Sequence, residues 1–109
     1  LKPYVAKGLR VVSTGGTAAY LKENNIPVVY IQDQTGFPEV MDGRVRTLHP
    51  KVHMALLARL ENEEDVKLLK DYNLEPFDLV IGNLYEFEKY SATVSDEREL
   101  TEYIDIGGP

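Results

Sequence analysis

The sequence lacks cysteine in all of its 109 residues. The chain therefore forms no disulfide, uses no thiolate nucleophile and offers no cysteine ligand to a metal. It also lacks any apolar run near the roughly 20 residues that a membrane-spanning helix needs, and no signal peptide opens it. We therefore expect a cytoplasmic enzyme or binding domain with no membrane partner.

Basic side chains are outnumbered: 12 Lys and Arg against 18 Asp and Glu give a net charge of −6. That balance argues against nucleic acid as a partner, because nucleic-acid binding needs an electropositive face. The 43% hydrophobic and 28% charged fractions are those of an ordinary globular domain, and 109 residues suffice for one core. Residues 43–60, however, carry several Lys and Arg and no acid. One basic loop in an acidic chain indicates a small anionic ligand.

Two of these basic residues, Arg44 and Arg46, lie in a loop from Thr35 to Pro50, called here the basic loop. It shows neither the alternation of a strand nor an apolar stripe at helical spacing. Its glycines permit backbone angles that other residues avoid and its prolines fix them, which predicts a defined shape. Arg44 and Arg46 offer planar forks suited to phosphate or carboxylate, and on an extended segment they would point the same way. The alternative is a pair of solvated surface arginines.

Apolar runs bounded by turn residues alternate with segments of helical spacing. The apolar runs predict strands at residues 9–13, 26–31 and 77–82. Helical spacing and capping residues predict helices up to Gly8, at 18–25, from Pro50 to Leu60, from Asn62 to about Tyr72, and from Ser95 to about Tyr103, with residues from Asn83 onward as loop. This alternation is typical of an α/β fold, a three-layer Rossmann-like parallel sheet with helices on both faces.

Ligands of such sheets bind at the carboxyl ends of the strands. The fold therefore predicts that Thr14–Thr17, the basic loop and Gly82–Tyr85 converge. Thr14-Gly15-Gly16-Thr17 joins a strand to a helix N-terminus, where unpaired N–H groups and the helix dipole favour an anion. The alternative is an ordinary turn in which Thr14 or Thr17 caps the helix.

His49 and His53 are four residues apart, a spacing that suits two zinc ligands on one helix. Pro50 is expected to start the helix, which leaves His49 outside it, and no third ligand is evident. We therefore expect a capping or hydrogen-bonded His49 and no metal.

Tyr85 follows the third predicted strand, and Asp105 lies between isoleucines before two glycines. Tyr85 is either a proton donor or a packed ring beside Phe87. Asp105 is either buried with a partner or placed for chemistry, because burying an unpaired carboxylate is costly.

Motifs along the chain resemble a known family: in order they read STGGTA, TGFPE, DGRVRTLHPKVH, NLY and IDIGGP. Their order and spacing resemble the IMP cyclohydrolase domain of the PurH family of bifunctional purine biosynthesis enzymes. The resemblance covers residues 1–109. STGGTA is shared more widely, with methylglyoxal synthase and the regulatory domain of carbamoyl phosphate synthetase. The resemblance implies a methylglyoxal-synthase-like domain, which we expect to be cut at both ends and followed in its parent protein by an AICAR transformylase domain.

The implied reaction closes the ring of 5-formamido-imidazole-4-carboxamide ribonucleotide (FAICAR), with loss of water, to give inosine monophosphate (IMP). The resemblance implies no cofactor for this step, folate only for the transformylase domain, and a homodimer formed through the parent protein.

The resemblance also implies roles for residues at matching positions. The 5′-phosphate would be held by Thr14, Gly15, Gly16 and Thr17, and the base and phosphate would be lined by Arg44, Val45, Arg46 and Thr47. Gly82 and Asn83 would touch the base, with Ile106 beside the nucleotide. The catalytic set would be Arg46, Tyr85 and Asp105.

Arg46 departs from the family, which usually has lysine there. Arginine keeps the charge but does not readily transfer a proton, so it favours oxyanion stabilisation over acid catalysis. The family's serine-aspartate-lysine phosphate loop is expected before Leu1, and its catalytic lysine beyond Pro109. Two alternatives share the Thr14–Thr17 turn: a non-catalytic regulatory domain that binds a phosphorylated effector, and a methylglyoxal synthase. The GRVRTLHP motif favours the cyclohydrolase over both.

Overall fold

The structure is a computed structural model that describes residues 1–108; the predicted domain limit at residue 109 lies outside the described residues. The chain divides into two units, Leu1–Pro76 and Phe77–Pro109. No helix among the described residues is both long enough and apolar enough to cross a membrane.

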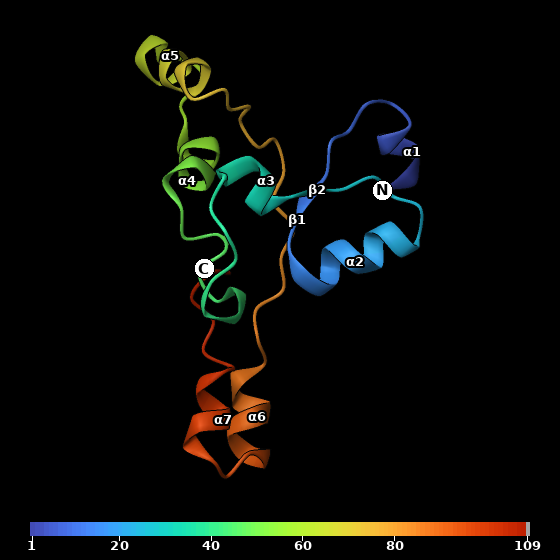
Figure 1. The fold of residues 1–109 in the computed structure, drawn as a ribbon, viewed down its shortest axis with the longest axis vertical. Helices are drawn as coiled ribbons and strands as arrows, with labels where there is room; N and C mark the ends of the chain where they lie inside the picture. The colour runs from blue at the N-terminus through green and yellow to red at the C-terminus, as the bar shows by residue number, and fades with distance from the viewer. Residues whose placement is uncertain (109) are drawn as a thin grey trace. The chain divides into compact units, whose positions relative to one another are not determined.

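The first unit contains a small parallel sheet. Strand β1 (Val12–Ser13) is followed by helix α2 (Gly15–Glu23) and strand β2 (Val29–Tyr30), as Figure 1 shows. Val12 pairs with Val29 and Ser13 with Tyr30. The strand–helix–strand order was predicted, and it is the connection that parallel strands require. The strands are shorter than predicted, because only two residues of each predicted strand pair with the other strand.

Short helices complete the first unit. They are α1 (Lys2–Val5), α3 (Ile31–Thr35), the 3₁₀ helix η1 (Met41–Gly43), α4 (Pro50–Leu57) and α5 (Glu63–Asp71). Helix α4 begins at Pro50 as predicted. Helix α5 begins after Asn62, whose side chain accepts hydrogen bonds from the amides of Glu64 (2.9 Å) and Asp65 (3.1 Å). Helix α3 was not predicted, and it ends at Gly36, whose φ of 70° suits glycine.

The core of the first unit is small and draws on several helices. Its buried apolar residues are Ala18, Ile26, Ile31, Val52, Ala55, Leu69 and Leu74. Val52 and Ala55 form the inner side of α4. Leu56 and Leu57 of the same helix are 43% and 74% exposed, and Tyr72, directly after α5, is 53% exposed.

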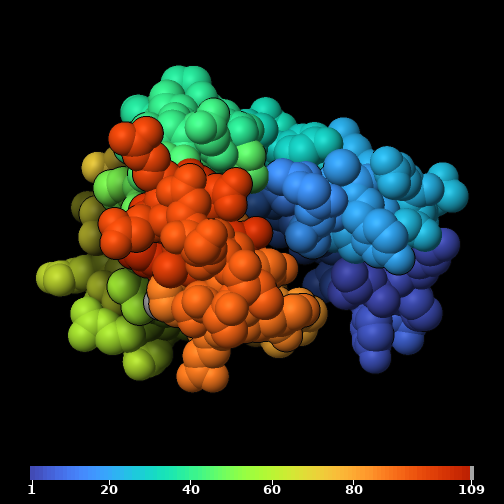
Figure 2. All heavy atoms as spheres, turned by 90° about the horizontal axis from the view of Figure 1, so that it is seen from below, coloured from blue at the N-terminus to red at the C-terminus, as the bar shows by residue number. Residues whose placement is uncertain are grey.

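The second unit contains two helices and no strand among its described residues. Helices α6 (Phe87–Thr93) and α7 (Glu97–Thr101) lie side by side, and their atoms are drawn in orange and red in Figure 2. Helix α6 was predicted as loop. The ring of Tyr90, at the middle of the helix, stacks on Tyr103 with 3.7 Å between centroids. The cap of α7 is Asp96, which accepts from the amide of Arg98 at 2.9 Å, and not the predicted Ser95.

The predicted third strand, residues 77–82, is wrong. Leu79, Val80 and Ile81 are between 66% and 75% exposed, and the sheet of the described residues contains only β1 and β2. A strand exists through hydrogen bonds to a neighbour, and an apolar run alone does not supply one. The three-layer sheet is therefore not found, although the α/β alternation of the first unit is.

Candidate functional site

The turn from β1 into α2 exposes unpaired backbone donors. Thr14 is the N-cap residue of α2, and its side chain makes no capping hydrogen bond. Thr14 is thus the cap residue, as one alternative expected, but its hydroxyl does not pair with the first amides of the helix. The first amides of a helix have no intrahelical partner and carry the positive end of the helix dipole. The turn keeps the donors that an anion would use.

The guanidinium of Arg46 lies against this turn. A Cβ atom at Gly15 would overlap Nη1 of Arg46, and one at Gly43 would overlap its Nε and Cζ. Both glycines also have positive φ, +51° and +79°. Each position therefore disfavours other residues for two reasons: the backbone angle and the overlap of a Cβ with Arg46. The contact joins the Thr14–Thr17 turn to the basic loop, two of the three segments that the fold predicted to converge.

Arg46 is largely buried and only partly paired. Its side chain is 24% exposed, and Nη2 forms a salt bridge with Glu39. Its Nε is buried and has no hydrogen-bond partner among the described residues. Residues 43–60 contain no acid, and the partner of Arg46 is Glu39, which lies earlier in the same loop.

The basic loop is a series of helical turns and not an extended segment. The amides of Arg44 and Leu48 donate to the carbonyls of Met41 (3.1 Å) and Val45 (3.2 Å). Arg44 itself has helical angles, φ −63° and ψ −22°. Residues two apart in a helix lie about 200° apart around its axis. The extended segment on which Arg44 and Arg46 would point the same way is therefore not found.

His49 caps α4, as expected. Its Nδ1 accepts a hydrogen bond from the amide of Lys51 at 3.1 Å, and its ring lies 6.0 Å from that of Phe37. His53 turns back to the same point, with Nδ1 at 3.1 Å from the His49 carbonyl oxygen. In residues 1–108 no group of three His, Cys, Asp or Glu is placed to hold a metal ion.

In the second unit the structure brings Tyr85 and Asp105 together. The Tyr85 amide donates to Asp105 Oδ2 at 3.3 Å, and the Gly108 amide donates to Oδ1 at 2.8 Å. Asp105 is half-buried, so it combines partial burial with backbone partners. A carboxylate has about four lone-pair positions, so each oxygen keeps room for a further donor. The Tyr85 side chain is 57% exposed, with its ring edge-on to Tyr103 at 6.1 Å.

The remaining predicted contacts are accessible or half-buried. In the second unit Gly82, Asn83 and Ile106 are exposed. In the basic loop Val45 and Thr47 are half-buried and Arg44 is exposed.

A cavity of about 450 Å³ adjoins Arg46 in the first unit. Its lining is mostly apolar and also includes Gln32, Arg46 and His49. The Oε1 atom of Gln32 is buried with no hydrogen-bond partner among the described residues. Sequence reasoning missed Gln32, because nothing in the local pattern of α3 distinguishes it from Gln34.

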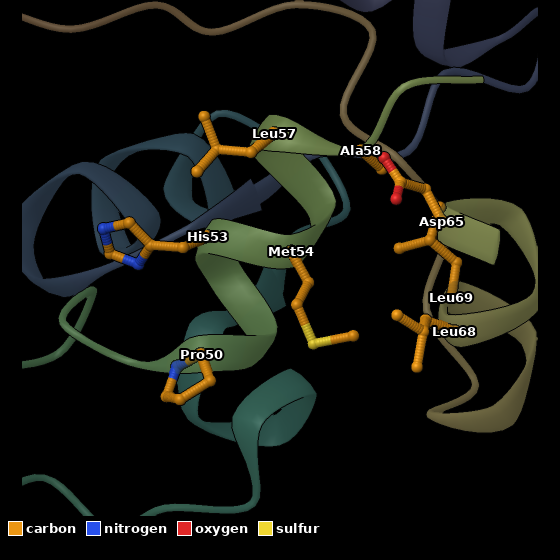
Figure 3. A pocket seen from close by; sticks show the side chains of 8 residues that line it. All are labelled: Pro50, His53, Met54, Leu57, Ala58, Asp65, Leu68 and Leu69. Carbon is orange, nitrogen blue, oxygen red and sulfur yellow. The ribbon is translucent and has the colours of Figure 1, made fainter. Parts of the chain in front are cut away.

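A second hollow, of about 370 Å³, lies between α4 and α5. Figure 3 shows the Met54 side chain extending from α4 toward Leu68 of α5, while His53 points away from α5. Asp65 at its rim is occupied by Arg59, whose hydrogen bonds lower the pKa of the Asp65 carboxyl. This hollow contains none of the predicted binding or catalytic residues.

A parallel strand–helix–strand unit, with a glycine turn against a half-buried arginine, defines a small α/β domain. The family model for the MGS-like domain matches residues 1–109, and the chain belongs to that family.

Its relatives include bifunctional purine biosynthesis proteins. PurH of Thermoanaerobacter sp. (strain X514) is 53% identical over 106 residues, which cover 94% of this chain and 20% of that protein. PurH of Fusobacterium nucleatum subsp. nucleatum is 51% identical over 106 residues, which cover 96% of this chain and 21% of that protein. The chain thus spans about a fifth of the length of these curated relatives. The predicted resemblance to the PurH family is confirmed.

The crystal structure of ForH is also similar. It superposes with a TM-score of 0.73 at 33% sequence identity, over 96% of this chain and 53% of ForH.

Proposed function

We propose that this chain is the IMP cyclohydrolase part of a bifunctional purine biosynthesis protein, which closes FAICAR to IMP with loss of water. The AICAR transformylase domain, and the homodimer formed through it, belong to the parent protein in this proposal. The identity of about 50% to PurH proteins supports the proposal. The observation that carries it is the contact between the Arg46 guanidinium and Gly15 at the start of α2.

The phosphate of the nucleotide would bind at this contact. The first amides of α2 donate to an anion, and Arg46 adds a fork of N–H donors and a full charge beside them. Glu39 now occupies Nη2, and its side chain is 44% exposed. A dianionic phosphate competes well with a single exposed carboxylate, because it brings twice the charge to the same donors.

The chemistry needs a nucleophile held against an electrophile and a site for the developing oxyanion. The carboxamide nitrogen of FAICAR attacks its formyl carbon, and the former carbonyl oxygen then leaves as water. Asp105 would accept a hydrogen bond from the attacking amide, using the lone pairs that Tyr85 and Gly108 leave free. Tyr85 would donate to the departing oxygen. Because the reaction is intramolecular, positioning supplies much of its rate.

Arg46 would act as a fixed cation. Guanidinium stays protonated at neutral pH, so Arg46 would stabilise the negative charge of the phosphate and of the oxyanion without transferring a proton. Its positive charge is held in place by the two glycines and Glu39 before substrate arrives, so little reorganisation is needed.

The test follows IMP formation from FAICAR by the intact parent protein. We expect turnover, and we expect Arg44→Ala to weaken nucleotide binding at least tenfold while Lys51→Ala does not. Arg44 is an exposed arginine of the basic loop, whereas the Lys51 amide is bonded to His49 in the first turn of α4. Nucleotide binding without any turnover would refute the enzyme and favour a regulatory domain that binds a phosphorylated effector. Equal effects of the two substitutions would show that the basic loop is misassigned.

A further inference from the structure

His49 stands where the basic loop ends and α4 begins. Its Nδ1 atom accepts a hydrogen bond from the amide of Lys51 at 3.1 Å, so the imidazole caps the N-terminus of the helix. Its ring also contacts Phe37 near the start of the loop, with 6.0 Å between the ring centroids. Arg46 and its partner Glu39 both lie between Phe37 and His49 in the chain. The contacts of one side chain therefore close the segment that carries the Arg46 ion pair.

Backbone turns connect His49 to Arg46. The His49 amide donates to the Thr47 carbonyl at 2.9 Å, and the Leu48 amide donates to the Val45 carbonyl at 3.2 Å. His49 and Arg46 also line the same cavity of about 450 Å³. Each turn restricts the dihedral angles of its residues, so a displacement of His49 is transmitted to Arg46.

The hydrogen bonds of the two histidines require different tautomers. An imidazole nitrogen that accepts from an amide carries no proton, so Nδ1 of His49 is unprotonated. A carbonyl oxygen only accepts, so Nδ1 of His53, at 3.1 Å from the His49 carbonyl oxygen, carries a proton. His53 lies one turn further along α4 (Figure 3). Protonation of His53 therefore keeps its bond, whereas protonation of His49 places an N–H against the Lys51 N–H and removes the cap.

The surroundings of His49 offer no partner to a protonated ring. The start of α4 is the positive end of the helix dipole, and Lys51 and His53 are the basic side chains of its first turns. Arg46, paired with Glu39, lines the same cavity as His49. Helix α3 places no titratable side chain in the lining, and none of the described lining residues is an acid. A protonated ring thus loses its bond to the helix and gains no carboxylate from the cavity.

We propose that His49 is a positioning residue of the anion site: with Nδ1 unprotonated it fixes the end of the basic loop and so the place of Arg46, and its protonation releases the loop. The inference rests on the proposed function, in which Arg46 binds the phosphate of the nucleotide. It also determines the direction of a pH effect. A histidine that acted only through its charge would strengthen anion binding when protonated, whereas a cap that is lost on protonation weakens anion binding.

The experiment compares two replacements of His49 in the full chain. His49→Asn keeps an acceptor that does not titrate, and in this chain Asn62 caps the corresponding amide of α5 at 2.9 Å from a similarly extended backbone. His49→Phe keeps a ring beside Phe37 and removes the acceptor. Binding of ribose 5-phosphate is measured by isothermal titration calorimetry from about pH 8 to about pH 5.5, the range in which histidine ordinarily changes charge. Because the probe itself titrates identically with every chain, the ratio of two affinities reports the protein alone.

We expect the unaltered chain to lose roughly fivefold in affinity relative to His49→Asn as the pH falls across this range, since an N-cap acceptor shifts an equilibrium by about this factor. At the upper pH, His49→Phe should bind roughly fivefold more weakly than His49→Asn, for the same reason. His53→Gln is the control, because it removes the other histidine of α4 and should leave the pH dependence unchanged. Circular dichroism establishes that each variant is folded. Should His49→Phe not fold, the ratio of the unaltered chain to His49→Asn decides alone.

The outcomes separate this proposal from the proposed function. A ratio that does not change with pH, a ratio that moves in favour of the unaltered chain at low pH, or a pH dependence that disappears in His53→Gln overturns the positioning role and leaves phosphate binding and turnover standing. The expected ratio, with no IMP formation by the parent protein, supports the positioning role and overturns the proposed reaction. Absence of ribose 5-phosphate binding at every pH overturns both.

Discussion

Replacing Arg46 with glutamine tests the centre of the candidate site. The change removes the positive charge and the fork of donors and leaves a shorter, neutral polar side chain. In the structure Arg46 lies against Gly15 and Gly43 and pairs with Glu39. We expect Arg46→Gln to weaken phosphate binding strongly and to affect stability little.

The magnitude follows from burial and pairing. A hydrogen bond to a charged group contributes about 1.5–3 kcal/mol. The Arg46 side chain is 24% exposed, so water screens it little, but Glu39 already neutralises part of its charge. We therefore take about 2 kcal/mol, which is roughly a 30-fold loss of affinity at 1.4 kcal/mol per tenfold. The cost to folding is about 0–1 kcal/mol, because Glu39 is partly exposed and can return to water.

The assay is calorimetric titration with ribose 5-phosphate at two salt concentrations, with urea unfolding in parallel. Arg59→Gln is the control: Arg59 is also an arginine in an ion pair, with Asp65, and it lies outside the basic loop and the α2 turn. The control should bind ribose 5-phosphate as the unaltered chain does. If both variants lose the same affinity for ribose 5-phosphate, the loss comes from the change in net charge alone. If Arg46→Gln loses no affinity, Arg46 does not bind the phosphate and its ion pair with Glu39 has only a structural role.

Three further predictions concern stability. Gly43→Ala should lower the free energy of unfolding by about 1–2 kcal/mol, because φ is +79° and a Cβ would overlap Arg46. The control Gly16→Ala, which has open space around it in α2, should instead raise the free energy of unfolding by about 0.5 kcal/mol. Equal effects of the two substitutions in urea unfolding would contradict the contact between Gly43 and Arg46. Asn62→Ala should cost about 1 kcal/mol through loss of the α5 cap, and unchanged urea unfolding would show that the cap contributes nothing. The hydrogen bond from Arg59 lowers the pKa of Asp65 below its ordinary 3.8, so its stabilisation is present above pH 3.8 and lost as the pH falls through the lower, folded value. The Tm of Asp65→Asn should therefore fall less between pH 4 and pH 2 than the Tm of the unaltered chain. An identical acid profile would exclude the pair as the cause.

The features predicted correctly from sequence depend on neighbours in the chain. Asn62 stands directly before a run of acids and caps α5, and His49 stands directly before Pro50 and caps α4. Such caps involve residues two or three positions apart, so the sequence displays both partners together. The strand–helix–strand order around Thr14–Thr17 is equally local.

The sequence by itself determined the caps, the order of the elements in the first unit and the family signature in the basic loop. Only the tertiary structure decided that residues 77–82 pair with no strand, that Tyr90 of α6 stacks on Tyr103, and that the Arg46 guanidinium lies against Gly15. It also showed that Gln32, which has no distinctive sequence context, lines the same cavity as Arg46 and has a buried side-chain oxygen without a partner among the described residues. The physical reason is the same in each case: a strand, a stacked ring or an unpaired donor is defined by what lies opposite it, and that partner is distant in the chain.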